Sequence, residues 1–255
     1  MKASELFDLK GKVALITGCS RGLGKDISLS LAQNGASLVL SDLVYPKETS
    51  EEISKITSEY IVLKADVSNE QSVLNLTREA ISRFKRVDIL INNAGIAQAG
   101  FIPTEDAPIE EWDKVMAVNL RGVFLCSKHV GKEMIKNRKG SIINIASTAG
   151  FTGVPRSPAY CSSKAGVILL TKSLALEWAR YNIRVNAIAP HYLKTDLTSA
   201  LESSKNVYDS LIKQIPMRRF GLTSELIGLI LLLASDASTY MTGTVAISDG
   251  GYLAQ

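Results

Sequence analysis

The stretch LITGCSRGLG, residues 15–24, places three glycines between an aliphatic run and the start of an expected helix. Gly18, Gly22 and Gly24 let the backbone come close to a diphosphate, and the helix N-terminus offers free N–H groups with partial positive charge. Asp42 ends the next aliphatic run, where a carboxylate can accept hydrogen bonds from a ribose 2′-hydroxyl. The glycine turn, the helix start and Asp42 together predict a dinucleotide-binding βαβ unit.

Aliphatic runs recur along the rest of the chain and alternate with stretches of helical periodicity. Most of these runs are apolar throughout, which is typical of parallel strands buried on both faces. We therefore expect one α/β domain over residues 1–255, a Rossmann fold with a doubly wound, seven-stranded parallel sheet and helices on both faces. The expected strands are 13–17, 37–41, 61–65, 88–91, 141–146, 183–189 and 244–248, and the expected helices are 23–34, 47–58, 70–84, 110–136, 159–180 and 224–234.

The longest segment without an expected strand runs from residue 195 to residue 223 and has only a short helical pattern. Connections of that length in a compact domain are usually functional. We expect this segment to be a substrate lid.

Composition argues against several other classes of protein. The 29 Lys and Arg residues only slightly outnumber the 25 Asp and Glu residues and form no basic–aromatic patch, so the pI of about 8.9 is weak evidence for nucleic-acid binding. The three cysteines lack a CxxC spacing, which suits a reducing cytosol, and the two histidines lack zinc-ligand spacing, so we expect no metal. The chain begins without an apolar signal core, and its longest apolar run, 226–234, is about half the length that spans a bilayer. We expect a cytoplasmic protein that binds neither membrane nor nucleic acid.

A second motif, SPAYCSSKAG at residues 157–166, sets Tyr160 and Lys164 four residues apart. On a helix this spacing stacks the phenol and the ammonium on one face. A tyrosine pKa is ordinarily about 10, and a nearby positive charge favours the phenolate. The pair is either an acid–base device or an ordinary helix surface.

The ordered motifs resemble those of the short-chain dehydrogenase/reductase family in its single-domain form. The resemblance covers essentially the whole chain, and although one motif alone is weak evidence, the ordered set is specific. The motifs are TGCSRGLG at 17–24, ADV at 65–67, NNAG at 92–95, VNL at 118–120, IASTAG at 145–150 and YCSSK at 160–164.

The resemblance implies a catalytic set of Ser147, Tyr160, Lys164 and Asn119. Tyr160 would be the acid–base residue of hydride transfer, its pKa lowered by roughly two to three units by Lys164 and the oxidised nicotinamide. Ser147 would hydrogen-bond the substrate oxygen, Lys164 would also hold the nicotinamide ribose, and Asn119 would hold a proton-relaying water. Taken singly, Asn119 is equally well a polar plug in a helix and Ser147 a turn residue.

The resemblance also implies the residues that contact the cofactor. Asp66 would lie beside the adenine, the NNAG turn would line the ribose, and Thr195 would reach the pyrophosphate or the carboxamide. The full set is Gly18, Ser20, Arg21, Gly22, Leu23, Gly24, Asp42, Leu43, Asp66, Val67, Asn93, Ala94, Gly95, Tyr160, Lys164, Pro190, Leu193 and Thr195.

Two residues of this set pull the cofactor preference in opposite directions. Asp42 repels a 2′-phosphate and favours NAD, whereas Arg21 in the glycine turn could pair with that phosphate. Leu43 stands where NADP-dependent relatives often carry a basic residue. Because a carboxylate near a dianion costs more than one mobile arginine returns, we expect NAD to be preferred and NADP to be possible.

The expected substrate is a secondary alcohol or its ketone, of the polyol or sugar-acid type, because segments such as IPMRRFG resemble gluconate-type and polyol dehydrogenases. The alternative is an NADPH-dependent 3-oxoacyl-[acyl-carrier-protein] reductase, to which Arg218 and Arg219 would contribute a basic docking patch. A catalytically silent scaffold is disfavoured because the catalytic set is whole. The expected pocket residues are Ser147, Ala149, Phe151, Val154, Tyr160 and His191, with Leu193 and the lid completing its wall.

His191 stands where the family usually has a glycine. Its side chain either narrows the pocket and reaches the substrate or turns to solvent.

The expected helices 110–136 and 159–180 carry apolar residues on more than one face, for example Val115, Val118, Phe124 and Val130 on the first. Such helices need a second partner, which two-fold packing between subunits provides. We expect a homotetramer.

Overall fold

The computed structural model describes residues 3–98 and 102–255, so residues 1–2 and 99–101 of the expected domain lie outside the described residues. One parallel sheet of seven strands runs in the order β3-β2-β1-β4-β5-β6-β7. The predicted doubly wound sheet is confirmed, and each strand begins and ends within one residue of its expected bounds. The strands are β1 (Val13–Thr17), β2 (Ser37–Asp42), β3 (Tyr60–Lys64), β4 (Ile89–Asn92), β5 (Gly140–Ile145), β6 (Ile183–Pro190) and β7 (Val245–Ser248).

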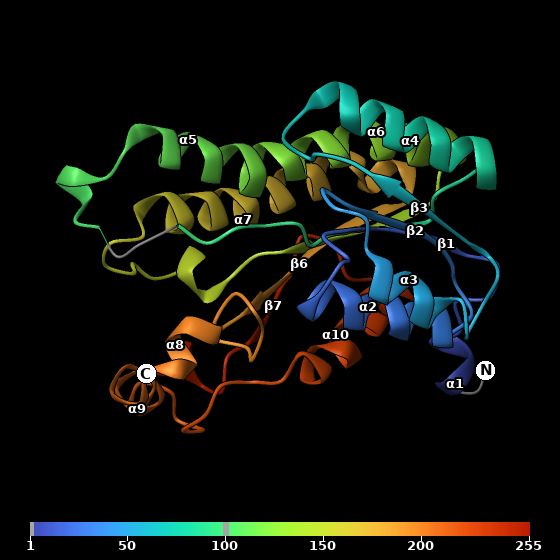
Figure 1. The fold of residues 1–255 in the computed structure, drawn as a ribbon. Helices are drawn as coiled ribbons and strands as arrows, with labels where there is room; N and C mark the ends of the chain where they lie inside the picture. The colour runs from blue at the N-terminus through green and yellow to red at the C-terminus, as the bar shows by residue number, and fades with distance from the viewer. Residues whose placement is uncertain (1–2, 99–101) are drawn as a thin grey trace.

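Helices cover both faces of this sheet (Figure 1). One face carries α4 (Glu70–Phe84), α5 (Ile109–Met116), α6 (Gly122–Asn137) and α7 (Pro158–Trp178). The opposite face carries α2 (Gly22–Gln33), α3 (Lys47–Ile53) and α10 (Ile227–Ala234), while the short α1 (Ala3–Leu6) precedes β1. The chain order reverses between β1 and β4, and ligands of open α/β sheets bind at such a switch point.

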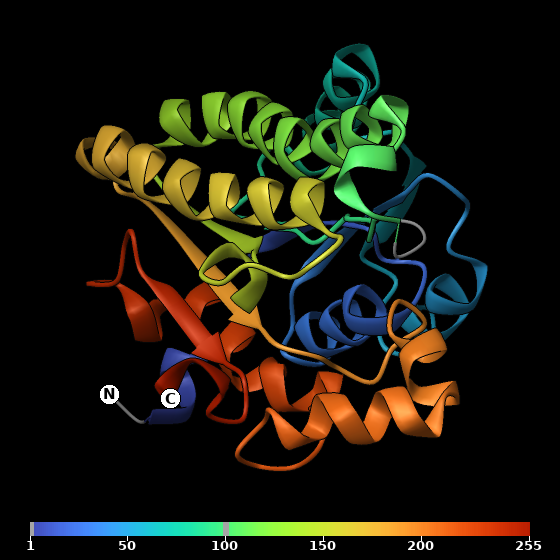
Figure 2. The ribbon, with the colours of Figure 1, turned by 90° about the vertical axis from the view of Figure 1, so that its left-hand side faces the viewer.

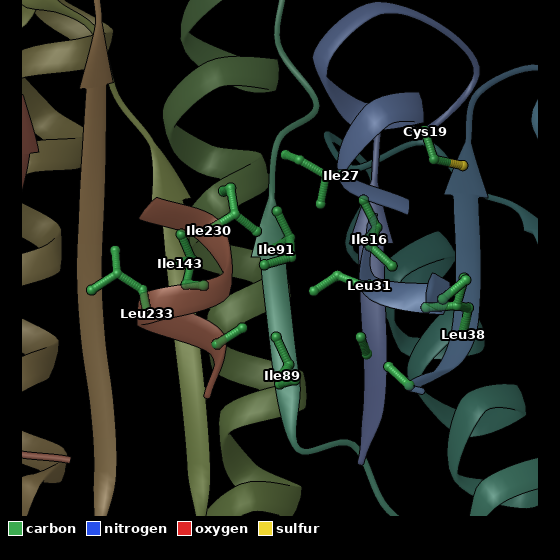
Figure 3. Packing of buried hydrophobic residues seen from close by; sticks show 14 of the residues in the cluster. Ile16, Cys19, Ile27, Leu31, Leu38, Ile89, Ile91, Ile143, Ile230 and Leu233 are labelled. Carbon is green, nitrogen blue, oxygen red and sulfur yellow. The ribbon is translucent and has the colours of Figure 1, made fainter. Parts of the chain in front are cut away.

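Neighbouring residues of each central strand enter different cores, which explains why the strands are apolar throughout. Ile16 and Ile91 pack with Ile27 and Leu31 of α2 and Ile230 of α10 (Figure 3). Leu15, Leu90 and Ile142 point to the other face, where they pack with Leu125 and Trp178. Full burial of one such side chain stabilises the fold by about 1.5–3 kcal/mol, so the two cores hold both helical layers on the sheet.

The long helix expected over 110–136 is present but is not α-helical throughout. Residues Ala117–Arg121 form a π-helical turn between α5 and α6. This turn contains Asn119, which is completely buried. The helix expected over 47–58 is shorter than predicted and ends at Ile53.

The segment 195–223 contains two short helices, α8 (Ser199–Ser203) and α9 (Lys205–Lys213), in which no residue is buried. Its ends meet, because Leu193 forms an isolated bridge with Gly221 and the Lys194 N–H donates to the Gly221 carbonyl at 2.9 Å. Ile215 and Phe220 are buried, so the later part of the segment belongs to the body of the protein. Figure 2 shows α8 and α9, in orange, at the end of the molecule that also carries the loop from β5 to α7.

Among the residues that the structure describes, every helix is too short or too polar to cross a membrane.

Candidate active site

The glycine turn joins β1 to α2 and depends on the absence of side chains at two positions. Gly18 has a φ of +70°, and a Cβ there would lie 2.7 Å from the Ala94 Cα. A Cβ at Gly24 would lie 2.0 Å from the Gly18 carbonyl oxygen. Arg21, the N-cap residue of α2, makes no side-chain capping bond, so the first N–H groups of the helix remain available to an anion.

The NNAG turn after β4 fastens the glycine turn in place. The Asn93 side-chain amide donates to the carbonyls of Thr17 and Gly18 at 3.1 and 2.8 Å. The Thr17 hydroxyl accepts from the N–H groups of Asn93 and Ala94, both at 3.2 Å. The predicted nucleotide residues of β1 and β4 therefore form one rigid unit at the switch point of the sheet.

The acidic residue at the end of β2 is held by the backbone of the same unit. Asp42 accepts from the Ser20 N–H at 2.8 Å through Oδ2 and from the Leu43 N–H at 2.7 Å through Oδ1. Each carboxylate oxygen keeps a further lone pair for a ribose hydroxyl. The Ser20 hydroxyl oxygen is buried without a partner among the described residues, as expected of a group that meets a phosphate oxygen.

The start of the segment 195–223 faces the glycine turn. A Cβ at Gly22 would lie 3.6 Å from the Thr195 side chain, and Arg21 pairs with Asp196 at 3.4 Å across the same gap. These contacts place Thr195 beside the helix N-terminus, as predicted for a residue that reaches the pyrophosphate.

The other predicted cofactor residues differ in how far their side chains are exposed. Leu43 is two-thirds exposed (66%) beside Asp42, and the Asp66 carboxylate accepts from the Ser68 N–H at 2.9 Å and hydroxyl at 2.7 Å. Val67 and Leu193 are buried, at 8% exposure each, so they offer a cofactor little surface. Leu23 is partly buried against the core, Gly95 lies near the Lys164 ammonium, and Pro190 ends β6.

Ser147, Tyr160 and Lys164 come together where β5 ends and α7 begins. Ser147 caps the 3₁₀ turn Thr148–Gly150, its hydroxyl accepting from the Ala149 N–H at 3.1 Å. Pro158 at the first turn of α7 fixes the start of the helix, and Tyr160 follows two residues later. The Lys164 ammonium lies 5.6 Å from the centre of the Tyr160 ring, so the predicted shared helix face is confirmed.

The predicted lowering of the Tyr160 pKa is not produced by these side chains on their own. Burial raises the pKa of Tyr160, and a hydrogen bond with Ser147 opposes this rise only in part. Burial also lowers the pKa of Lys164 to about 8, and its ammonium donates to the Ile145 carbonyl at 2.8 Å instead of to the phenol. The predicted lowering depends on the oxidised nicotinamide as well as on Lys164, and it stays a prediction, because a second positive charge would be needed to favour the phenolate against burial.

Asn119 ties three elements together. Its Oδ1 accepts from the Ile96 N–H at 2.8 Å, and its Nδ2 donates to the Ile96 carbonyl at 2.9 Å and to the Ser163 hydroxyl at 3.3 Å. The side chain therefore fixes the loop after β4 against α7. The proton-relaying water predicted for Asn119 stays a prediction.

His191 does not turn to solvent, so that alternative was wrong. Its Nδ1 lies 2.7 Å from the Thr148 hydroxyl, and its ring stacks on Tyr252 at 3.9 Å between centroids. The residue has no positive φ, so this position does not require glycine. Of the other predicted pocket residues, Ala149 is buried, Phe151 is about half exposed at 46%, and the Val154 N–H donates to the Cys161 sulfur at 3.3 Å.

Comparison with known proteins agrees with this arrangement. The family model described as Enoyl-(Acyl carrier protein) reductase matches residues 18–253. The 2-dehydro-3-deoxy-D-gluconate 5-dehydrogenase of Dickeya dadantii is 42% identical over 253 residues, covering 98% of each chain, and the 3-oxoacyl-[acyl-carrier-protein] reductase of Thermotoga maritima is 40% identical over 248 residues, covering 95% of this chain and 98% of that one. A gluconate 5-dehydrogenase from Burkholderia cenocepacia, solved with NADP and tartrate, superposes with a TM-score of 0.94 at 34% identity, covering 100% of both chains.

The chain belongs to the short-chain dehydrogenase/reductase family.

This short-chain dehydrogenase/reductase is an NAD(P)-dependent oxidoreductase that acts on CH–OH groups, interconverting a secondary alcohol and a ketone. The glycine turn, the uncapped start of α2 and the unpaired Ser20 hydroxyl suit the diphosphate of such a cofactor. Within residues 3–98 and 102–255, no group of three or more His, Cys, Asp or Glu side chains is arranged to hold a metal ion.

Four residues of the dehydrogenase site were not predicted from the sequence. Thr148, Tyr192 and Tyr252 surround His191, and Ser163 bonds Asn119. Thr148 and Ser163 lie inside motifs that were recognised, so their position was a usable signal. Tyr252 offered none, because only the folded chain brings the C-terminus to β6.

Proposed function

We propose that the protein oxidises a secondary hydroxyl of a sugar acid or polyol with NAD, and reduces the corresponding ketone, with Tyr160 as the acid–base residue. The observation that supports this proposal most is that Ser147, Tyr160 and Lys164 come together at the end of β5. This strand is the direct neighbour of β4, which belongs to the nucleotide unit. A bound oxidised nicotinamide would supply the hydride acceptor and a positive charge beside these side chains.

Each residue then has a distinct task. Tyr160 takes the proton of the substrate hydroxyl. Ser147, which lies beside the phenol, hydrogen-bonds the substrate oxygen and stabilises the negative charge that develops on it. Lys164, almost fully buried, is a fixed cation beside the phenol and available to a ribose hydroxyl. Asn119 positions Ser163 and the loop after β4.

The preference for a polar substrate over an acyl thioester rests on the pocket and on the two arginines of the expected docking patch. Thr148, the residue after Ser147, bonds His191 through its hydroxyl, and the His191 ring contacts that of Tyr192, so polar side chains gather near Ser147. Arg219 forms a two-pronged ion pair with Glu225 at 2.6 and 2.7 Å, and Arg218 donates to the Lys213 carbonyl. Both arginines have partners within the chain, which weakens the case for a carrier-protein docking patch.

The proposed NAD preference rests on Asp42, whose carboxylate is fixed by two backbone N–H groups. Arg21, the residue that would attract a 2′-phosphate, pairs with Asp196 instead. The Burkholderia enzyme solved with NADP points the other way, so residual NADP use is part of the proposal.

We also propose a homotetramer built through α5, α6 and α7. Ile109, Trp112, Phe124, Leu169 and Leu176 are exposed on these helices, Leu176 by 85%. A hollow of about 530 Å³ on this surface is lined mainly by apolar residues, Met116, Ala117, Leu120, Phe124 and Leu170, with Asp113 and Arg121 beside them. Val115 and Val130 are buried inside the subunit, so of the residues first considered only Phe124 is exposed.

The proposed location is the cytoplasm. It rests on three cysteines that form no disulfide, Cys19 and Cys126 being buried. The proposed lid, residues 195–223, rests on the exposed helices α8 and α9.

The test is turnover followed by the absorbance of reduced nicotinamide. Gluconate, 2-keto-3-deoxygluconate, glycerol, sorbitol and an acetoacetyl thioester would each be assayed with both cofactors in the matching direction. We expect the highest kcat/KM for a sugar acid or polyol with NAD. Preferred reduction of the thioester with NADPH would establish the alternative instead.

A further inference from the structure

A row of five aromatic rings in contact crosses from the terminal turn of the chain to the proposed lid. Tyr252 stacks on His191 at 3.9 Å, His191 contacts Tyr192 at 4.4 Å, and Tyr192 stacks on Phe220 at 5.0 Å. Phe220 in turn meets Tyr208 of α9 edge-on at 4.9 Å. His191 is the ring of this row that bonds the catalytic turn, through Thr148, so the row connects that turn with the lid.

Only one of the two ring nitrogens of His191 has a partner. Nδ1 lies 2.7 Å from the Thr148 hydroxyl, whereas Nε2 is buried with no hydrogen-bond partner among the described residues. Nearly all buried polar atoms in folded proteins are paired, and those that are not call for an explanation. A nitrogen held one hydrogen bond away from the residue after Ser147 is well placed to meet a second oxygen of a substrate whose reacting oxygen lies at Ser147.

We propose that His191 is a specificity-determining residue whose Nε2 hydrogen-bonds a hydroxyl or carboxylate oxygen of the substrate near its reacting carbon. This inference rests on the proposed function and narrows it: the site favours substrates with several oxygens over ketones and alcohols with only apolar substituents. Sites built to hydrogen-bond a substrate oxygen reject analogues that lack it, because the protein group is then left unpaired.

The chemistry of the imidazole fits both oxygen types. Burial lowers the pKa of His191 to about 4, although Asp249 opposes the shift, so the ring is neutral at physiological pH. If the Thr148 hydroxyl donates to Nδ1, Nε2 carries the proton and donates to a carboxylate or a hydroxyl oxygen. With the other tautomer Nε2 accepts from a substrate hydroxyl.

The rings that pack against His191 lie on two peripheral segments of the described chain. Tyr252 belongs to the terminal 3₁₀ turn Tyr252–Ala254, three residues from the end of the chain. In the other direction the row of rings ends in Phe220 and Tyr208, the latter on the exposed helix α9. Because Nε2 is buried, a substrate oxygen can reach it only if a neighbouring segment shifts, and these two segments are the candidates.

Three substitutions at His191 distinguish the effect of each ring nitrogen from the effect of the stacked ring. His191→Asn keeps a polar group near the Nδ1 position and loses the one at Nε2. His191→Gln keeps a polar group near Nε2, and His191→Phe keeps a stacked ring but loses both nitrogens. Each would be assayed with the best sugar acid or polyol of the panel and with 2-butanol, with the thermal midpoint and NADH fluorescence as controls for folding and cofactor binding.

With the oxygen-rich substrate we expect kcat/KM to fall about tenfold or more in His191→Asn and His191→Phe, mainly through KM, and to stay within about threefold in His191→Gln. With 2-butanol all three variants should stay within about threefold of the wild type. Equal losses on both substrates, or no loss on either, would overturn the inference while leaving the proposed function intact. If the wild type turned over no alcohol or ketone at all, the proposed function would fail and the inference with it.

Discussion

At the scale of single residues, the proposed chemistry depends most on the phenol of Tyr160. Tyr160→Phe removes the transferable proton and very little volume, so we expect kcat to fall at least a hundredfold, within the range of general acid–base catalysis. NAD binding, measured by fluorescence titration, should hardly change. The control is Tyr240→Phe, at a tyrosine that is fully exposed. A variant that kept more than about a tenth of wild-type kcat would lose at most about 1.4 kcal/mol of barrier lowering and would exclude Tyr160 as the acid–base residue.

The proposed NAD preference depends on Asp42 at the same scale. Asp42→Ala removes the carboxylate that would face the adenosine ribose, so kcat/KM should fall for NAD and rise for NADP. Arg21→Ala, as the paired control, should lower kcat/KM for NADP and leave that for NAD nearly unchanged. Initial rates with both cofactors give the ratio. A wild type that preferred NADP by tenfold or more would show that Arg21 outweighs Asp42.

The sequence predicted contacts between residues that are close together along the chain, and it did not predict contacts between distant segments. Tyr160 and Lys164 are one helical turn apart, so their spacing alone places them on one face. The contact of His191 with Thr148 and Tyr252 joins three distant segments, and only the fold brings them together. The sequence did not show how strongly burial opposes the phenolate of Tyr160 and raises its pKa, because burial is a property of the folded chain.

At the scale of elements, two helical glycines make a matched pair. A Cβ at Gly24, in the first turn of α2, would lie 2.0 Å from the Gly18 carbonyl oxygen. We therefore expect Gly24→Ala to displace the glycine turn, to lower the thermal midpoint and to weaken NAD binding at least tenfold.

Gly228 in α10 is the opposite case, because no atom lies within 4 Å of the place its Cβ would take. Gly228→Ala should raise the free energy of unfolding by about 0.5–1 kcal/mol and leave activity unchanged. Both variants would be followed by denaturant unfolding and NAD titration. If Gly24→Ala behaved like Gly228→Ala, the close packing of the glycine turn would not matter for cofactor binding.

The sequence predicted every strand of the sheet, because parallel strands buried on both faces are uninterrupted apolar runs. It did not predict the π-helical turn Ala117–Arg121, since one wider turn leaves the helical pattern on either side unchanged. The helices α8 and α9 were expected only as a short helical pattern, because helices with no buried residue leave a weak apolar periodicity.

At the scale of the whole molecule, the apolar surface over α5, α6 and α7 determines the expected assembly. Light scattering after size exclusion should give the mass of a tetramer at micromolar concentration. Leu169→Glu with Leu176→Glu should shift the mass downward, because two charges would enter the proposed interface. Ile56→Glu, at a partly exposed residue away from these helices, is the control. A wild-type monomer would remove the proposal.

The stability of the protein should also depend on pH through His191. The pKa of this imidazole is lowered to about 4 in the folded protein and is about 6.5 in an unfolded chain, so the unfolded state binds the extra proton first as pH falls. Asp249 raises this pKa, and the rings that pack against the imidazole are those of Tyr192 and Tyr252. The free energy of unfolding that depends on the neutral His191 ring is fully present above about pH 6.5, and it is lost as the pH falls from 6.5 to 4. His191→Phe cannot titrate, so its thermal midpoint should fall less steeply over this interval; parallel curves would contradict the assignment.

The bridge between Leu193 and Gly221 makes the segment 195–223, the proposed lid, a unit that can be replaced without disturbing the strands around it. The two ends of this segment lie side by side on the body of the protein. The length of the segment can therefore change without moving β6 or α10, which it connects. The entropy of closing such a loop rises by only about 0.6 kcal/mol for each doubling of its length. Insertions, deletions and whole transplants between Ser199 and Lys213 should therefore cost little, provided that Thr198 stays at the opening end and Ile215 and Phe220 at the closing end as buried anchors. New substrate ranges can be acquired there while the nucleotide half and the proton-transfer residues are inherited unchanged.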